Sequence, residues 1–239
     1  MIKKSHILSF FAVFLATSIL FSAWATRLFS PDIGILAQTE GDERPVVVID
    51  AGHGGIDGGA TGTDGTLEKD LNLAVSQKLA ALFALGGYTV VMTRTDDRSL
   101  AAPNAQKGHV KRSDLDARLK VLNQYPEGLF VSIHMNAYQG VPCQGLQVWY
   151  SEGAPSSAEY AAAVQAGVKA LLQPENNRKI KAATSSIYLL RQASTPAILI
   201  ECGFLSNEEE CERLKCEAYQ QSVALAIFAS LHQKMQCNT

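Results

Sequence analysis

The chain alternates between short apolar runs and longer segments in which apolar residues recur every three or four positions. The first run, PVVVID at residues 45–50, is rich in β-branched residues and predicts a strand buried on both faces. Residues 67–87 have leucines and alanines at helical spacing and close on two glycines, and YTVVMTR at 88–94 predicts the next strand. A strand, a helix and a strand in this order predict a βαβ unit and hence a parallel sheet.

The same alternation continues to the end of the chain. A polar loop at 95–112 precedes a helix at 113–125, for which Ser113 is the expected N-cap. The remaining expected elements are strands at 128–137, 145–151, 185–191 and 196–201, and helices at 156–173, 206–215 and 217–235. This order predicts one α/β domain with a mostly parallel sheet, whose ligand site lies beyond the carboxyl ends of the strands.

The N-terminus has the pattern of an export signal. A basic start is followed by an apolar, uncharged run at residues 7–25. Ala23 and Ala25 fit the small-residue rule for cleavage after residue 25, but a run of about 19 residues is also close to the ~20 that span a bilayer, so an uncleaved anchor is the alternative. We therefore expect a signal peptide or membrane anchor at 1–25, a linker at 26–44 and a catalytic domain at 45–236, which works outside the cytoplasm and meets the membrane only through the N-terminal segment.

Composition narrows the function classes. With 239 residues, 47% of them hydrophobic, the chain can bury one substantial core. The net charge is only -2, and no basic tract points to nucleic acid. The five cysteines lack CxxC spacing, so a cysteine zinc site is not expected, and their odd number leaves at least one unpaired.

Three of the predicted strands end in residues that can do chemistry. His53 follows the strand at 45–50, His134 lies at the end of the strand at 128–137, and Glu201 ends the strand at 196–201. Glu68 sits just before the first long helix, whose N-terminus faces the same edge of the sheet. Because the carboxyl ends of parallel strands lie along one edge, these four residues are expected to converge there.

Two histidines and one carboxylate, with a fourth position left to water, are typical of a catalytic zinc site. We therefore expect His53, Glu68 and His134 to bind Zn²⁺, with glycines around His53 leaving its ring exposed in a cleft. Glu201 is then a spare carboxylate that can take a proton from the activated water and return it to a leaving amine. Asp50 is a candidate to orient the site from outside the ligand set.

Each of these residues also has a purely structural interpretation. His53 alone could line a glycine turn, His134 could be a satisfied histidine at a strand end, and Glu68 alone could be an acid favoured by the helix dipole. Asn136 and Arg191 are candidates to hold substrate carbonyls or carboxylates, with a solvated or structural role as the alternative. The joint placement of the four residues, rather than any one of them, favours the zinc site.

The glycine run also suggests a nucleotide loop. Gly52, Gly54 and Gly58 give GxGxxxG, which is one residue longer than the dinucleotide fingerprint, and the segment continues as loop where that motif would begin a helix. An exported protein also has little access to NAD, so this alternative is disfavoured.

Five motifs together resemble the zinc-dependent N-acetylmuramoyl-L-alanine amidases of the amidase_3 family. The motifs are VVIDAGHGG, LEKDLNL, GYTVVMTR, FVSIHMNA and PAILIECGFLSN. The resemblance implies a six-stranded sheet flanked by helices, zinc ligation by His53, Glu68 and His134, and Glu201 as the catalytic base. It also implies peptidoglycan as the substrate, cleaved at the amide between N-acetylmuramic acid and L-alanine. Ala51 stands where many members have proline, and no catalytic effect is expected from it.

A finer resemblance is to the germination-specific spore-cortex amidases. It depends on the anchor-like leader, the lack of a wall-binding module and the segment at 107–137. It implies a role in forming muramic lactam in the cortex, action in the spore intermembrane space and a lipoprotein activator as partner. The alternatives are a general cell-wall amidase of growth or division, another exported zinc peptidase such as a carboxypeptidase, and a wall-binding protein with a vestigial site.

Overall fold

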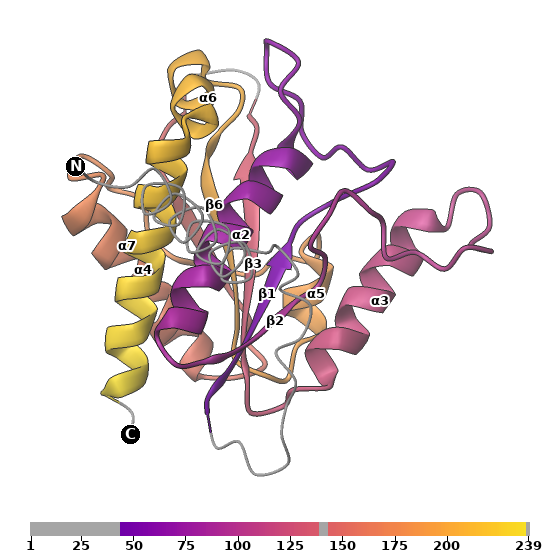
Figure 1. Ribbon diagram of the computed structural model, residues 1–239, viewed down its shortest axis with the longest axis horizontal. Helices are drawn as coiled ribbons and strands as arrows, with labels where there is room; N and C mark the ends of the chain where they lie inside the picture. Colours follow the sequence, from indigo (N-terminus) through magenta and orange to yellow (C-terminus); the bar gives the residue numbers. More distant parts are fainter. Residues whose placement is uncertain (1–43, 139–142, 238–239) are drawn as a thin grey trace, which may run out of the picture. The chain divides into compact units, whose positions relative to one another are not determined.

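The computed structural model describes residues 44–138 and 143–237. The predicted signal segment, and all but the last residue of the predicted linker, lie outside the described residues. Helices and strands alternate along most of the described chain, as the apolar pattern predicts, except that β4 follows β3 and α7 follows α6 (Figure 1). The strands are β1 (Val46–Ala51), β2 (Thr89–Met92), β3 (Leu129–Asn136), β4 (Gln147–Tyr150), β5 (Lys181–Ala182) and β6 (Ala197–Phe204). The helices are α2 (Glu68–Leu85), α3 (Val110–Asn123), α4 (Ser156–Leu171), α5 (Tyr188–Gln192), α6 (Glu208–Lys215) and α7 (Glu217–Gln236).

The six strands form one sheet in the order β2-β1-β3-β6-β4-β5. All neighbouring strands are parallel except β4 and β6, which are antiparallel. The predicted α/β domain with a mostly parallel, six-stranded sheet is therefore confirmed. Because β1, β3 and β6 are adjacent and parallel, their carboxyl ends lie side by side at one edge of the sheet.

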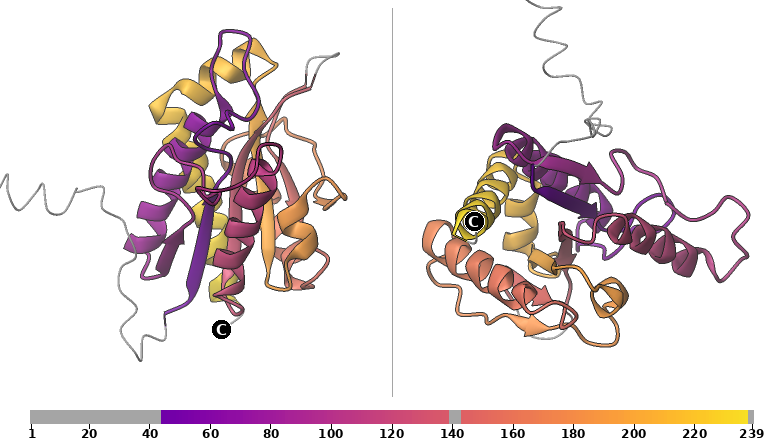
Figure 2. Two further views of the ribbon diagram at one scale, coloured as in Figure 1. Left: turned by 90° about the vertical axis from the view of Figure 1, so that its right-hand side faces the viewer. Right: turned by 90° about the horizontal axis from the view of Figure 1, so that it is seen from below.

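Helices cover both faces of the sheet (Figures 1 and 2). On one face α2, α4 and α7 pack on the strands, and their buried residues include Phe83, Val164 and Ile227. On the other face α3 and α5 contribute Leu122 and Leu190 to a second, smaller core. At about 1.5–3 kcal/mol for each large apolar side chain fully buried, these two cores hold the strand ends in place.

The predicted strand at 185–191 is wrong. Its residues form a turn followed by the short helix α5, which buries the consecutive residues Leu189 and Leu190. An apolar run of this length does not distinguish a strand from a buried helical turn, and the flanking residues decide. The neighbouring strand β5 was missed because only two residues form it and Lys181 is exposed.

The helix predicted at 113–125 begins three residues earlier, at Val110, so Ser113 is not its N-cap. The Ser113 hydroxyl instead accepts a hydrogen bond from the Ala102 backbone N–H, at 3.0 Å. This contact ties the preceding polar loop to α3.

Within the described ranges, no helix combines the length and the apolar character that crossing a bilayer requires. The five cysteines all belong to the described residues and are free thiols, which agrees with the expectation that at least one is unpaired.

Candidate active site

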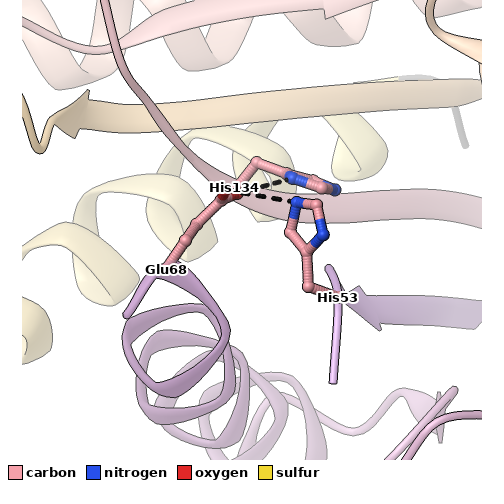
Figure 3. A group of neighbouring side chains, drawn as sticks. All are labelled: His53, Glu68 and His134. Carbon is pink, nitrogen blue, oxygen red and sulfur yellow. Dashed lines mark hydrogen bonds and ion pairs between the residues drawn. The ribbon is translucent and has the colours of Figure 1, made fainter. Parts of the chain in front are cut away.

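His53, Glu68 and His134 meet at the carboxyl edge of the sheet, although they are far apart in the sequence (Figure 3). His53 follows the end of β1, Glu68 is the first residue of α2, and His134 lies near the end of β3. One ligand atom from each of the three residues lies within 4.8 Å of the others. The predicted convergence of these three side chains is therefore present.

The carboxylate of Glu68 lies between the two imidazoles. Its Oε1 is 2.8 Å from Nδ1 of His134, and its Oε2 is 3.2 Å from Nε2 of His53. Burial by itself would raise the pKa of Glu68, but hydrogen bonds and charge from the two histidines outweigh burial and hold this pKa below its usual range. Further donors to this carboxylate are Ala60 N, Met135 N and Asn72 Nδ2.

Two glycines make the close approach of these side chains possible. A Cβ atom at Gly52 would lie 2.3 Å from Nε2 of His134, and one at Gly59 would lie 2.5 Å from Oε2 of Glu68. His53 itself has a left-handed backbone, with φ of 60°, so the chain turns sharply there. The His53 side chain is only 16% exposed, so its ring is more enclosed than the glycine run predicted.

Asp57 contacts the outer nitrogen of His53. Its Oδ2 lies 2.9 Å from Nδ1 of His53, so Nε2 of the same ring faces Glu68. Burial opposes the charged imidazole, but hydrogen bonds and charge from Glu68 and Asp57 raise the pKa of His53 above its usual value. The Asp57 carboxylate is itself held by the Gly59 backbone N–H at 3.1 Å and by Nζ of Lys111 at 3.6 Å. The sequence reasoning missed Asp57, whose only signal is its position four residues after His53 in the same loop.

Asp50 is buried below the site and does not touch the His53 ring. Its carboxylate accepts hydrogen bonds from Arg118 Nη1 at 2.6 Å, Ser132 Oγ at 2.7 Å and Thr93 Oγ1 at 2.8 Å. Burial opposes ionisation, but Arg118 and the two hydroxyls lower the pKa of Asp50 below its usual value. Asp50 is therefore positioned to act on the site through Arg118.

Two buried arginines hold the backbone that carries His53. Arg118 donates to the carbonyls of Ala51 and His53, at 2.8 and 2.6 Å. Arg94 donates to the carbonyls of Ala51 and Gly52, both at 2.9 Å. Neither arginine was predicted from the sequence as a site residue, although the position of each gives a signal. Arg118 occurs among the leucines of its helix, and Arg94 follows a buried strand.

Glu201 lies beside the three-residue cluster on β6. It pairs with His134 across the parallel β3–β6 ladder, so both side chains lie at the same level of the sheet. Its Oε2 is buried and has no hydrogen-bond partner among the described residues. Burial raises the pKa of Glu201 to about 7, because it outweighs the charge of His134 and His53, and the negative charge of Glu68 adds to the rise.

The two substrate-contact candidates lie in different places. Asn136 ends β3, two residues after His134, and its carbonyl accepts from the Leu205 N–H at 2.8 Å. Arg191 lies on α5, where Nη1 is 3.2 Å from Oε2 of Glu152. Glu152 follows the carboxyl end of the antiparallel strand β4, at the sheet edge opposite Glu201. The structure thus brings Asn136 close to the site and does not bring Arg191 there.

A partly buried His-Glu-His cluster beside a carboxylate of raised pKa is the donor arrangement of a metal-assisted hydrolase. The family model for N-acetylmuramoyl-L-alanine amidase matches residues 47–233. The chain belongs to this family, whose members are hydrolases that act on peptidoglycan.

Similar proteins agree with this assignment. The germination-specific N-acetylmuramoyl-L-alanine amidase of Bacillus subtilis is 35% identical over 188 residues, which are 78% of each chain. The CwlD amidase of Clostridioides difficile, solved in complex with the GerS lipoprotein, is 38% identical with a TM-score of 0.77 over 81% of this chain and 100% of that one. The amidase AmiC2 of Nostoc punctiforme is 31% identical with a TM-score of 0.69, over 80% of this chain and 97% of that one.

Proposed function

We propose that this protein is a zinc-dependent amidase in which His53, Glu68 and His134 hold the ion and Glu201 is the catalytic base. The observation that carries the proposal is the convergence of the three donors next to a carboxylate whose Oε2 has no hydrogen-bond partner among the described residues. Their ligand atoms are close enough to share one ion, with small movements to the ~2.0–2.2 Å that zinc ligands require. The Oε2 atom of Glu201 is buried without a hydrogen-bond partner among the described residues, and Glu201 pairs with His134 across the β3–β6 ladder.

The chain's own residues divide the work of hydrolysis between them. When bound, zinc supplies Lewis-acid chemistry, which polarises the amide carbonyl and makes water more acidic. Glu201 accepts a proton from the attacking water as the new C–O bond forms, and it passes that proton to the alanine nitrogen as the C–N bond breaks. Asp57 orients the ring of His53, and Arg118 and Arg94 hold the backbone on which this ring stands.

We infer further that the substrate is spore-cortex peptidoglycan and that the protein acts outside the cytoplasm, with a lipoprotein as partner. This inference is supported by the name of the Bacillus subtilis relative and by the lipoprotein complex of the Clostridioides difficile amidase. A general cell-wall role is the alternative, because a probable cell wall amidase of Staphylococcus aureus, LytH, is 30% identical over 219 residues.

A digest of purified cortex and vegetative peptidoglycan, followed by mass analysis, tests both parts of the proposal. Release of whole stem peptides that begin with L-alanine supports the amidase, whereas release of single terminal amino acids would indicate a carboxypeptidase. The activity should disappear with a chelator and return with zinc. Faster digestion of cortex supports the spore role, and equal or faster digestion of vegetative wall would contradict it.

A further inference from the structure

The turn at residues 54–57 brings Asp57 back to the ring of His53. Two backbone hydrogen bonds close this turn, from Gly54 N to Asp57 O at 3.0 Å and from Asp57 N to Gly54 O at 3.2 Å. Ile56, at the tip of the turn, is 84% exposed, so burial of its side chain contributes little to holding the turn in place. The position of the turn therefore depends on polar contacts with other parts of the chain.

One ion pair binds both backbone polar groups of Gly55, the residue before Ile56. Nζ of Lys69 donates to the Gly55 carbonyl at 2.8 Å, and Oδ1 of Asp97 accepts from the Gly55 N–H, also at 2.8 Å. The two side chains also contact each other, because Nζ of Lys69 lies 2.7 Å from Oδ2 of Asp97. The Lys69–Asp97 pair thus holds the turn at its tip.

The pair joins the turn to two neighbouring segments. Lys69 belongs to α2, and Asp97 lies in the loop after β2. Gly55 has a left-handed φ of 60°, and a Cβ atom there would lie 2.8 Å from the Ser99 backbone nitrogen, so the turn lies directly against that loop. The Lys69 side chain is only 13% exposed, so water screens this pair less than it screens a fully exposed pair.

The pair supports a different part of the chain from the two buried arginines. Arg94 and Arg118 bind carbonyls at residues 51–53, which come before the turn. Asp57 comes at the end of the turn, beyond the reach of these contacts in the chain. The arginines therefore place the backbone of His53, whereas the position of the Asp57 carboxylate depends on the turn.

We propose that Lys69 and Asp97 are positioning residues for the metal site, because their ion pair holds the turn that presents Asp57. With the turn fixed, Asp57 stays on Nδ1 of His53, and Nε2 of the ring stays directed toward Glu68. This inference rests on the proposed zinc-dependent function. Loss of the pair should weaken zinc binding in a protein that is still folded.

The test measures zinc affinity by competition with a chromophoric chelator, together with the melting temperature of the metal-free protein. Asp97→Asn places an amide where a carboxylate met the Lys69 ammonium, and Lys69→Met removes the donor to the Gly55 carbonyl. We expect each variant to bind zinc about tenfold more weakly, the lower end of the loss when a carboxylate that orients a ligating histidine is removed. The matched control is Asp96→Asn, an exposed acid in the same loop, which should bind zinc like the wild type.

The signs of the two effects distinguish support of the turn from a simple charge effect. Removing a positive charge near a cation site would by itself strengthen zinc binding, and removing a negative charge would weaken it. Support of the turn predicts weaker binding in both variants, Lys69→Met included. In an Asp57→Ala background, Asp97→Asn should cause no further loss, because the turn then has no carboxylate to present.

Three outcomes would overturn this inference and leave the proposed function intact. They are unchanged or stronger zinc binding by Lys69→Met, losses from Asp57→Ala and Asp97→Asn that add in the double variant, and a lower melting temperature of Asp97→Asn with unchanged zinc affinity. The last outcome would show that the pair stabilises the fold alone. Failure of the wild type to bind zinc would instead overturn the proposed function.

Discussion

Two glutamates at the same edge of the sheet have opposite surroundings. Glu68, at the start of α2, is surrounded by donors, and its pKa is held below the usual range. Glu201, within β6, is partly buried, its Oε2 is buried without a hydrogen-bond partner among the described residues, and burial raises its pKa to about 7. The two residues are of the same type, so their surroundings account for the difference. Glu68 stays ionised and is suited to bind a cation, whereas Glu201 can exchange a proton near neutral pH.

The largest effect is expected at Glu68. In a Glu68→Gln variant the side chain keeps its size but loses the charge that balances a divalent ion and two imidazoles. We expect zinc binding to be lost and amidase activity to fall to background, measured by metal analysis after dialysis and by stem-peptide release. Asp70→Asn, an exposed acid in the same helical turn, is the control. Full zinc occupancy in Glu68→Gln would contradict the role assigned to Glu68.

The Glu201→Gln variant should distinguish most clearly between the metal-binding role of Glu68 and the proton-transfer role of Glu201. General acid–base catalysis is typically worth about 10²–10⁴-fold, so we expect kcat to fall by about that factor while one zinc ion per chain remains bound. Kinetics and metal content measured on the same preparation check this, with the exposed acid variant Glu127→Gln as control. Activity near the wild-type level would show that another group is the base.

The buried ion pair between Asp50 and Arg118 is expected to affect the stability of the fold. Arg118→Met removes the partner of Asp50 and leaves a buried carboxylate uncompensated, which typically costs about 3–5 kcal/mol. Thermal unfolding should show a melting temperature lower by roughly ten degrees. Arg112→Met removes an exposed ion pair with Asp116 and two surface contacts with Tyr188, and it should lower the melting temperature less than Arg118→Met does. Equal shifts in the two variants would argue against a supporting role for the Asp50–Arg118 pair.

Asp57→Ala should weaken zinc binding without unfolding the protein. Loss of a carboxylate that orients a ligating histidine typically costs 10–100-fold in metal affinity. Competition titration with a chromophoric chelator measures this, and Asp96→Ala, an exposed acid paired with Arg98, is the control. An unchanged zinc affinity in Asp57→Ala would mean that the glycine turn alone orients His53.

The last prediction concerns a pH-dependent change of stability in the metal-free protein, which leaves the catalytic reaction out of account. Because the pKa of Glu201 is raised from its ordinary value of 4.5 to about 7, the folded state holds its proton more tightly than the unfolded state does. The stability that this proton provides is complete below about pH 4.5 and is lost as the pH rises through about 7. Glu201→Gln cannot lose that proton, so its melting temperature relative to wild type should rise over this range, by the equivalent of up to about 3 kcal/mol. A difference in melting temperature between Glu201→Gln and wild type that stays constant from pH 4 to pH 8 would contradict a raised pKa of Glu201.

Much of the fold and the candidate ligand set could be predicted because each lies in a local pattern. The apolar run ending at Asp50 and the one ending at Glu201 are unmistakable strands, and parallel topology brings their ends together. The cluster of His53, Glu68 and His134 follows from this topology, since each of these residues lies at or near the end of an element.

The supporting residues could not be predicted, because they depend on the path of loops in three dimensions. Asp57 reaches His53 only because the chain turns through a left-handed conformation at His53 itself. Arg118 reaches the His53 carbonyl from a helix that begins more than 50 residues later in the chain. The role expected of Asp50 likewise depends on Arg118, a contact that no spacing in the sequence reveals.

Anomalous diffraction at the zinc absorption edge, from crystals of the zinc-loaded protein, tests the four-residue assignment most directly. We predict one strong peak about 2.0–2.2 Å from a nitrogen of His53, a nitrogen of His134 and a carboxylate oxygen of Glu68, with Glu201 nearby but not bound to the ion. A peak elsewhere, or a peak at this edge ligated by Glu201 in place of Glu68, would contradict the assignment.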